Sequence, residues 1–317
     1  MDAFAIDNGT YSLQAASISY EMFNRWIAYI DVKPRSIDTY TKAVRQFIRW
    51  LHENAINQPS RGDILSYRRY LEATTKPTTT QTYIIAIRQF FKWLEQEGIY
   101  RNVADNVKGA KIDRQHKKDY LTTGQTQAIL SGVEQHTEQG LRDYALLSIM
   151  VTGGLRTIEV SRANIEDLRT IGNSPVLFIQ GKGKDEKTEY VKLPQPVENA
   201  IRTYLAERGK QDPTAPLFTS TSNNNRGKRM TTRSISGIVK SRLRAAGYDS
   251  DRLTAHSLRH TAVTLSLMGG RSLQDVQQFA RHANIATTQI YAHNIDRAKN
   301  KCEETIANAI FKEATKK

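Results

Sequence analysis

Apolar residues recur at helical spacing through the first hundred residues of the chain. Phe23, Ile27 and Ile30 share one face of a first predicted helix. A second helix is expected after Pro34, with Ser36 as its cap. Its apolar positions, again at helical spacing, are Tyr40, Val44, Phe47, Ile48 and Leu51. This pattern predicts helices that each bury one face against a shared core.

Two further helices complete this predicted domain. A shorter one is expected after Ser60, and the last one opens at Thr78 to Thr80 and stops at Gly98. The core positions of the last helix are Ile84, Ile87, Phe91 and Leu94. Residues 17–101 are therefore predicted to form a compact four-helix domain, preceded by an N-terminal extension over residues 1–16.

Between residues 102 and 120 the helical pattern disappears. The segment NVADNVKGAKIDRQHKKDY has little apolar periodicity, and its basic residues are Lys108, Lys111, Arg114, Lys117 and Lys118. A solvated surface loop would have a similar composition. The position of the segment between two predicted folded regions favours a basic interdomain linker.

A second domain is predicted over residues 121–294. The run from Tyr144 to Val151 is almost entirely apolar, which indicates a helix that is buried on most sides. A short helix is expected at Ile158 to Ala163. Residues 176–180 (VLFIQ) and 189–194 (EYVKLP) are rich in β-forming residues and predict an antiparallel hairpin. A strand near Ile165 to Ile171 is expected to join them.

Helices then resume over residues 196–208 and 232–245, and from His256 nearly to the end, where residues 295–317 are expected to form a tail helix. In this tail, an apolar stripe is formed by Cys302, Ile306, Ile310 and Phe311. The stripe can dock on a neighbouring subunit or pack on its own domain. The fold predicted for the whole chain is mainly α with a small antiparallel β-sheet, in two domains.

Composition narrows the class of protein. The 317 residues include 46 Lys and Arg against 32 Asp and Glu, a net charge of +14 (46 − 32), and 39% are hydrophobic, enough for real cores. One cysteine excludes an internal disulfide framework and any multi-cysteine zinc site. No apolar run reaches the roughly 18 residues of a membrane helix, and the N-terminus lacks a signal-peptide pattern, so a soluble, intracellular protein is expected. The charge indicates a polyanionic partner or merely a solvated basic surface.

Candidate chemistry begins with HSLRH at residues 256–260, inside a predicted helix. His256 and Arg259 project from one face because they are three residues apart. They combine a proton-transfer group with a guanidinium, although a helical histidine is more often a packed or surface residue. His260, one turn from His256, is expected to pack or to hydrogen-bond behind the site.

Two segments upstream carry further charged groups. In TGGLRTIEV (152–160), the glycines end the buried helix and place Arg156 at the start of the next one, where Glu159 can orient it. A purely structural Arg–Glu pair is equally compatible with this spacing. GKGKDEKT (181–188) joins two strands and so is not a phosphate-binding loop, which leads into a helix. A lysine on this turn can enter a site, and Lys182, Lys184 and Lys187 compete for that role.

The last candidate segment is ARHANIATTQIYAH at residues 280–293. It places His282 nine residues before Tyr291. His282 precedes the start of a predicted short helix, and Tyr291 lies within that helix. The neighbouring stretch DVQQFARHANIATTQIY also has the rhythm of a helix-turn-helix, in which residues 285–291 would begin a recognition helix. Each of these segments is weak when it is taken alone.

Their order along the chain resembles the active-site signature of the tyrosine recombinase family, also called phage-type integrases. TGGLR resembles the family's TGLR segment, GKGKDEKTEYVKLP its β-hairpin, HSLRH its H-x-L-R-H box, and ARHANIATTQIYAH its LGH…T…Y box. The resemblance covers residues 17–300 and implies an N-terminal helical core-binding domain followed by an α+β catalytic domain. Two departures are Ala280-Arg281-His282 in place of Leu-Gly-His, and the additional Gly154.

The resemblance implies a site-specific DNA recombinase that uses no metal, nucleotide or other cofactor. Tyr291 would be the nucleophile that becomes linked to a 3′ phosphate, and Lys182 would protonate the departing 5′ oxygen. The phosphate would be bound by Arg156, Arg259, His256 and His282, with His256 alternatively taking the tyrosine proton. Glu159 and His260 would support these groups. Two guanidiniums suit a phosphodiester transition state because they donate forked hydrogen bonds to its non-bridging oxygens.

The expected partner is duplex DNA, clamped by the two domains with the basic linker along its backbone. Recombination implies a homo-tetramer, a Holliday junction and a possible directionality factor. We expect integration or excision of a mobile element, in the bacterial cytoplasm at the nucleoid and not at a membrane. Xer-like dimer resolution, DNA inversion, a type IB topoisomerase and a non-enzymatic helix-turn-helix regulator remain alternatives. Because the N-terminal extension before Ser17 is short, we expect a simple recombinase without the separate arm-binding domain of some integrases.

Overall fold

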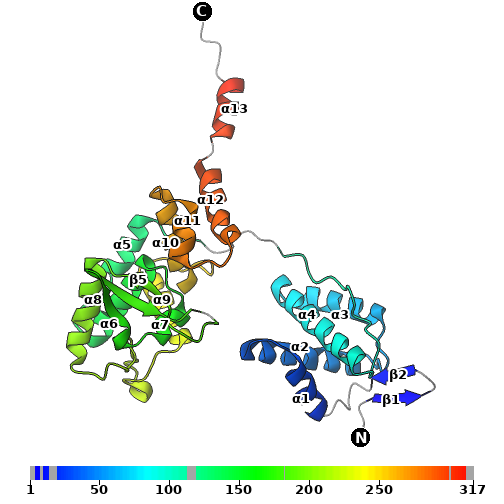
Figure 1. Cartoon of the computed structure of the whole chain (residues 1–317). Coiled ribbons are helices and arrows are strands. Elements are labelled where there is room, and N and C mark those ends of the chain that lie inside the picture. The colour runs from blue at the N-terminus through cyan, green and yellow to red at the C-terminus, as the bar shows by residue number, and fades with distance from the viewer. Residues whose placement is uncertain are drawn as a thin grey trace, which may run out of the picture. The chain divides into compact units, whose positions relative to one another are not determined.

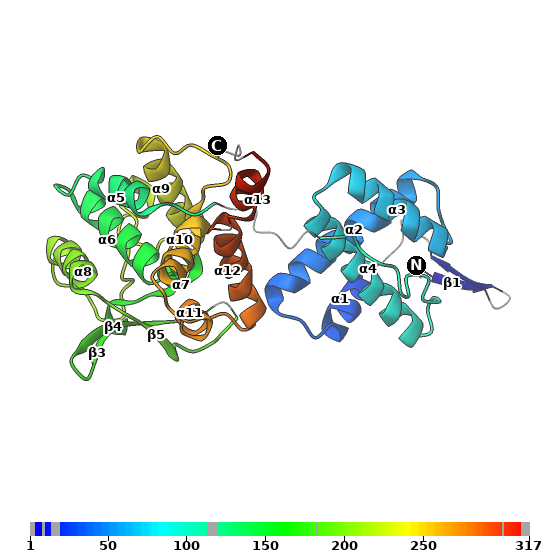
Figure 2. The same cartoon turned by 90° about the horizontal axis from the view of Figure 1, so that it is seen from above.

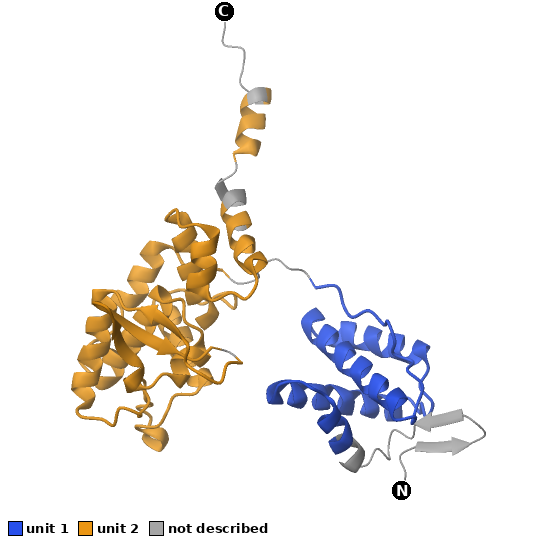
Figure 3. Ribbon diagram, viewed as in Figure 1, with its two compact units in different colours: residues 1–114 blue, residues 115–317 orange. Residues whose placement is uncertain are grey.

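The chain folds into two compact units, residues 1–114 and 115–317, in a computed structural model (Figure 3). The structure describes residues 4–7, 10–13, 20–112, 119–181, 183–299 and 301–311. It confirms a mainly α-helical chain with a small antiparallel sheet. None of the helices in these ranges combines the length and the apolar character that a membrane crossing requires.

The first unit contains four helices around an aromatic core (Figure 1). They are α1 (Tyr20–Tyr29), α2 (Pro34–Glu53), α3 (Arg61–Thr74) and α4 (Pro77–Gln96). Helix α2 packs on α4, which also contacts α1 and α3. Trp26 anchors α1 because it is fully buried and meets Phe90 edge-to-face at 5.3 Å. The expected contact positions Ile27 and Ile30 are half-buried and buried, whereas the side chain of Phe23 lies outside the described part.

The structure corrects one predicted cap and one predicted helix start in this unit. Ser36 is not the cap of α2, since the helix begins at Pro34, whose fixed φ and missing N–H suit the first helical position. For the same reason α4 begins at Pro77 instead of Thr78. Ser60 does cap α3, where its backbone N–H donates to the Asp63 carboxylate at 2.7 Å. Two short strands that the sequence did not predict, β1 (Phe4–Asp7) and β2 (Thr10–Leu13), form an antiparallel hairpin.

The predicted linker begins later than residue 102. Val103, Ala104 and Val107 are buried in the core of the first unit, although they show no helical periodicity. These residues lie in turns and irregular backbone, where buried apolar residues do not recur at a regular spacing in the sequence. At the other end Asp119 forms an ion pair with Arg252 of the second unit at 2.8 Å. The side chains of Lys108 and Lys111 are exposed, and Arg114, Lys117 and Lys118 lie outside the described residues.

The second unit surrounds a buried helix with further helices and one sheet. Its α-helices are α5 (Thr123–Ser131), α6 (Glu138–Thr152), α7 (Thr157–Arg162), α8 (Gln195–Arg208), α9 (Thr232–Ala245), α10 (Ala255–Met268), α11 (Leu273–Ala280), α12 (Ile285–Lys299) and α13 (Cys302–Phe311). Two 3₁₀ turns are η2 (Ile165–Asp167) and η3 (Asn223–Asn225). Helix α10 is central, against α6, α9, α11 and α12 (Figure 2). The tail helix α13 starts at Cys302, because residues 295–299 continue α12.

The sheet has the strand order β3 (Leu168–Ile171), β4 (Ser174–Ile179) and β5 (Glu189–Lys192), all antiparallel. Leu177 pairs with both Leu168 and Val191. Alternation along β4 and β5 places Leu177, Ile179 and Val191 in the core. The sheet thereby fixes the start and the end of the turn that carries the candidate lysines.

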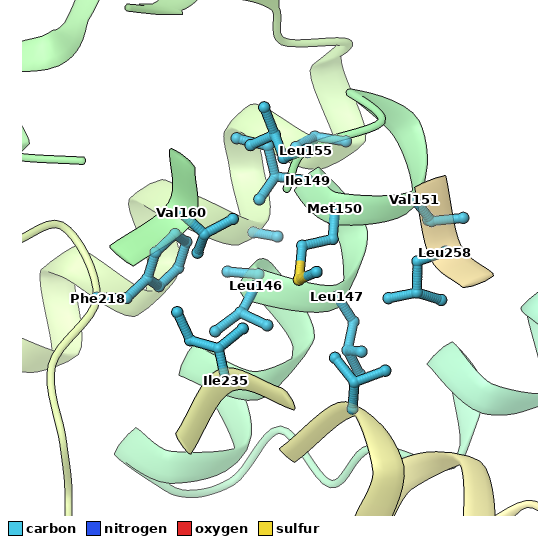
Figure 4. Packing of buried hydrophobic residues seen from close by; sticks show 14 of the residues in the cluster. Leu146, Leu147, Ile149, Met150, Val151, Leu155, Val160, Phe218, Ile235 and Leu258 are labelled. Carbon is cyan, nitrogen blue, oxygen red and sulfur yellow. The ribbon is translucent and has the colours of Figure 1, made fainter. Parts of the chain in front are cut away.

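The apolar run predicted as a buried helix is α6, and it forms the middle of this core. Leu146, Leu147, Ile149 and Met150 are at most 1% exposed. Their neighbours come from the loop after α6, from α7 and from α9 and α10, as the packing of Leu155, Val160, Ile235 and Leu258 shows (Figure 4). Because α6 is surrounded on nearly all sides, the residues directly after it have a fixed position.

A buried charged network centres on Asp143 in this unit. The Asp143 carboxylate accepts hydrogen bonds from Arg142 at 2.6 Å and from Arg242 of α9 at 2.7 Å. Arg142 also donates to the Thr219 carbonyl oxygen at 3.2 Å. The side chains of Arg142 and Asp143 are 4% and 3% exposed. This network joins α6, α9 and the loop after α8.

We expect Asp143→Asn to lower the free energy of unfolding by about 3 kcal/mol, because two guanidiniums would lose their shared counter-charge in a dry environment. Urea unfolding followed by circular dichroism measures this loss. The matched control is Asp249→Asn, which removes the same charge from an exposed pair with Lys240 and Arg244 and should leave the unfolding midpoint unchanged. Equal effects of the two substitutions would contradict the assignment.

Candidate active site

The turn after α6 positions the first candidate residue. Helix α6 ends at Thr152, and Gly154 follows with φ +58°, a conformation that favours glycine. A Cβ atom on Gly154 would lie 3.3 Å from the ring of Phe279, so space is restricted as well. The turn reverses the chain and makes Arg156 the N-cap residue of α7. The additional glycine therefore has a structural role.

Glu159 is fully buried and binds two arginines. Its Oε1 accepts a hydrogen bond from Arg156 Nη1 at 2.9 Å, and its Oε2 accepts one from Arg281 Nη2 at 3.2 Å. Oε2 also accepts the backbone N–H of Arg156 at 2.8 Å, at the positive end of α7. The guanidinium of Arg156 is held by the buried Glu159 carboxylate and still reaches solvent, because the Arg156 side chain is 29% exposed.

Arg259 approaches the same turn from α10. Its Nη1 donates to the Gly154 carbonyl oxygen at 2.7 Å and its Nη2 donates to the Ala280 carbonyl oxygen. Burial, followed by the charges of Arg156 and Arg281, lowers the pKa of Arg259 to about 9. A buried cation beside other cations favours an anionic ligand that would compensate their charge. His256, three residues earlier, is exposed.

The corner between α11 and α12 carries the remaining candidates. His282 Nδ1 lies 3.0 Å from the hydroxyl of Thr288, which is fully buried. The ring of Tyr291 stacks on that of His282 at 6.1 Å and lies 5.0 Å from that of His260. His260 also meets His256 at 4.6 Å. The rings of the three candidate histidines and of the candidate nucleophile therefore form one chain of neighbours, in the order His256, His260, Tyr291 and His282.

Tyr291 is only 4% exposed. Burial raises the pKa of its hydroxyl to about 12, although the nearby charges of Arg259 and Arg156 lower it in part. At neutral pH this tyrosine is protonated. It needs a base, or a change of surroundings, before it can act as a nucleophile.

Two of the three competing lysines are bound to carboxylates. Lys187 Nζ forms an ion pair with the buried Asp167 at 2.5 Å, and Lys184 Nζ forms one with Glu189 at 2.8 Å. The Lys187 pair anchors the hairpin turn to η2. Lys182 lies outside the described residues, between Gly181 and Gly183 at the same turn.

A cleft of about 610 Å³ joins the hairpin turn to the corner between α11 and α12. Its charged lining consists of Arg156, Lys184, Glu189, Arg281 and His282. Arg259 and Tyr291 are nearly covered and do not line it. The fold thus brings together Arg156, Glu159, Arg259, His282, His260 and Tyr291, whereas Lys108 and Lys111 belong to the other unit.

The sequence pattern of the phage integrase family matches residues 119–297, and that of its N-terminal SAM-like domain matches residues 23–98. The chain belongs to the phage integrase family. The first match contains every one of the candidate catalytic residues, and the second contains α2, α3, α4 and most of α1.

Relatives of this phage integrase family member include tyrosine recombinases. Tyrosine recombinase XerC of Pelobacter propionicus is 34% identical over 200 residues, which are 63% of each chain. The chain therefore aligns with less than two thirds of that relative's length. XerH recombinase bound to its difH substrate in a post-cleavage complex has a TM-score of 0.71 at 20% identity, over 92% of this chain and 86% of that one. The lambda integrase tetramer bound to a Holliday junction has a TM-score of 0.64 at 14% identity, over 86% and 75%.

Sequence reasoning overlooked two residues of the site. Arg281 was noted only as a departure from a family pattern, yet its side chain is 7% exposed and contacts Glu159. Thr288 lies beside His282 and six positions after it, a spacing that no simple helical rule connects across a corner. The arginine between Ala280 and His282 was visible in the sequence. Its burial, which shows that it belongs to the site, is not visible in a single sequence.

We expect Tyr291 to destabilise the folded chain at alkaline pH. An unfolded tyrosine ionises near its ordinary pKa of 10.0, whereas folded Tyr291 keeps its proton to about 12, so stability falls as pH rises between these values. The free energy of unfolding of Tyr291→Phe should decrease less than that of the wild type, by about 1 kcal/mol at roughly pH 11. Tyr190→Phe, which removes an exposed hydroxyl, is the control. Identical alkaline curves for Tyr291→Phe and the wild type would contradict the burial argument.

Proposed function

We propose that this chain is a site-specific DNA recombinase that cleaves and rejoins duplex DNA through a 3′-phosphotyrosine intermediate on Tyr291. The observation that supports this most is the arrangement around Glu159. Arg156 and Arg259 meet at the Gly153–Gly154 turn, beside the His282–Tyr291 stack. Two guanidiniums next to a tyrosine match the needs of a phosphodiester that is attacked by a phenolate.

In the proposed reaction the Tyr291 oxygen attacks the phosphorus atom. A bond from this oxygen to phosphorus forms, and the bond from phosphorus to the 5′ oxygen of the next nucleotide breaks. Arg156 and Arg259 donate hydrogen bonds to the non-bridging oxygens, whose negative charge increases in the transition state. His282, held by Thr288, donates to one of the same oxygens. Religation reverses these steps with a 5′ hydroxyl from another strand, and no external energy source is needed.

The proton transfers are assigned to the hairpin and to α10. Lys182 protonates the departing 5′ oxygen, an assignment supported by the binding of Lys187 to Asp167 and of Lys184 to Glu189. His256 accepts the proton of Tyr291 or holds the phosphate. His260 packs between His256 and Tyr291 and so supports either role.

Duplex DNA is the proposed partner and also the proposed activator. The net charge of +14 favours a polyanion, and Lys108 and Lys111 are exposed in the basic segment near the end of the first unit. Arg114, Lys117 and Lys118 are proposed to continue this contact along the backbone. Because Tyr291 is only 4% exposed, the proposed attack requires that its hydroxyl become accessible when the duplex binds. This keeps the nucleophile inactive until a phosphate is in place.

A homo-tetramer on two duplexes, with a Holliday junction between strand exchanges, is the proposed assembly. Its support in this chain is α13, where Ile306 and Ile310 are 57% and 65% exposed and offer an apolar surface to a neighbouring subunit. The proposed programme is integration or excision of a mobile element, with a directionality factor, at the bacterial nucleoid. Dimer resolution or inversion would use the same chemistry.

Two other functions remain for the experiment to exclude. A type IB topoisomerase would use the same tyrosine and the same cations but would form no junction between two sites. A helix-turn-helix regulator would use α12 as its recognition helix. That second function has less support, because Thr288 and Tyr291 of α12 are buried instead of facing outward.

We expect the wild-type protein to form an adduct with a nicked duplex that resists denaturant and forms in excess EDTA. The DNA site is first selected from random duplexes with Tyr291→Phe, which binds but has no nucleophile. Tyr291→Phe should give no adduct, Tyr190→Phe a normal amount, and Arg259→Ala an adduct rate lower by about 10²-fold to 10³-fold. A wild-type protein that binds the selected duplex and never becomes attached would rule out the enzyme. Junctions between two sites separate a recombinase from a topoisomerase.

We expect Lys182→Ala to slow adduct formation by about 10²-fold to 10⁴-fold, because the 5′ oxygen would leave without a proton. A duplex with sulfur at the 5′ bridging position should restore the rate, since a thiolate is a better leaving group and needs no acid. Lys184→Ala on the same turn is the matched control and should retain nearly the wild-type rate. If the sulfur duplex rescues Lys184→Ala and not Lys182→Ala, the assignment belongs to Lys184.

A further inference from the structure

Arg281 has no role in the proposed chemical steps, yet its guanidinium makes several hydrogen bonds to the Gly153–Gly154 turn and to Glu159. Its Nη2 donates to the Gly154 carbonyl oxygen at 3.1 Å and to Glu159 Oε2 at 3.2 Å. Its Nη1 donates to the Phe279 carbonyl oxygen at 2.8 Å. Both Nη atoms also approach the Gly153 carbonyl oxygen, at 3.4 and 3.5 Å. One guanidinium therefore joins the corner between α11 and α12 to the turn after α6.

The backbone of Arg281 is unusual for an arginine. It has φ +53° and ψ +48°, the left-handed conformation that glycine and asparagine adopt more easily. This conformation closes α11 and brings the backbone N–H of His282 to the Gln277 carbonyl oxygen at 3.0 Å. Strained backbone of this kind persists where the surroundings hold it, and it concentrates at functional sites. Here the side-chain contacts of Arg281 itself hold the strained residue in place.

The carboxylate of Glu159 divides its two oxygens between two arginines. Arg156 takes Oε1 with its side chain, and Arg281 shares Oε2 with the backbone N–H of Arg156. With Arg281 absent, Glu159 loses one side-chain partner, and Arg259 still bridges Gly154 and Ala280. Arg156 and His282, which both line the cleft, would then be held less firmly relative to each other.

From these contacts we infer that Arg281 is a positioning residue, which acts through Glu159 and Gly154 to hold Arg156 and His282 at a fixed spacing across the cleft. The inference rests on the proposed recombinase function. It concerns the rate of the chemical step and not the strength of DNA binding, because both Nη atoms of Arg281 donate to protein acceptors and its Nε is buried without a partner among the described residues. The residue is specific to this chain's Ala280-Arg281-His282 sequence, since a glycine at this position has no side chain for the same contacts.

The test is the single-turnover rate of adduct formation on the nicked duplex, measured together with duplex affinity and with the fraction of protein that reacts. Arg281→Gly permits the left-handed backbone and removes the guanidinium. We expect its rate constant to fall by about 10²-fold, the scale of a small misplacement of reacting groups, with DNA affinity within about threefold of the wild type. Arg281→Lys, which keeps the charge without the fork, should recover only part of the rate.

Two further variants separate positioning from a general loss of structure. Ala55→Gly relaxes another left-handed residue, in the first unit, and should leave the rate unchanged. If Arg281 acts through Glu159, the Arg281→Gly/Glu159→Gln double variant should be no slower than the slower single variant. A merely structural role would lower the fraction of protein that reacts and leave the rate constant unchanged, and that result would overturn the inference. The inference would also be overturned if the fold-losses in rate of the two single variants multiplied in the double variant.

The outcomes also distinguish this inference from the proposed function. Failure of the wild type to form an adduct rejects the recombinase itself. If the wild type and Ala55→Gly form the adduct, and Arg281→Gly and Arg281→Lys form it as fast as the wild type, only the role of Arg281 is rejected. Should Arg281→Gly be too unstable to isolate, Arg281→Lys and its double variant with Glu159→Gln provide the same comparison.

Discussion

Three guanidiniums of like charge share one small region of this chain, and a single buried carboxylate, Glu159, binds two of them. Much of the site depends on this interaction. Without Glu159, Arg156 and Arg281 would repel each other in a region of low dielectric constant, and the N-terminus of α7 would lose its cap. The third arginine, Arg259, forms no ion pair within the described residues and donates to the carbonyl oxygens of Gly154 and Ala280. These two neutral acceptors leave its positive charge uncompensated, and burial lowers its pKa.

The surrounding fold supplies the rigidity that this charge cluster requires. Helix α6 is buried on nearly all sides, so the Gly153–Gly154 turn at its end cannot move independently. Helix α10 packs directly on α6 and delivers Arg259, while α11 and α12 contribute Arg281, His282 and Tyr291. Tyr291 is nearly covered, and burial raises the pKa of its hydroxyl. The proposed chemistry therefore divides into a fixed anion site and a nucleophile that must be released.

Most of the elements could be predicted from the sequence, because helices and strands leave periodic patterns. The long apolar run of α6, the three strands and the span of α9 followed directly from such patterns. The errors occurred where no period exists. Val103, Ala104 and Val107 are buried in irregular turns, and the proline at the start of α2 displaced Ser36 as its cap. The order of the motifs selected Arg156, Arg259, His282 and Tyr291 as candidates, and the fold brings these four residues together.

By itself, the sequence determined the two-domain α-helical plan, the basic charge and the family, and it proposed a set of candidate residues, since periodicity, composition and motif order are properties of the linear chain. Only the tertiary structure decided how these residues are paired. Glu159 is shared between arginines that are 125 positions apart in the chain (281 − 156), and Lys187 is bound to Asp167 across the sheet. The near-complete burial of Tyr291 also required the fold, because the burial of one side chain depends on neighbours that are distant in sequence.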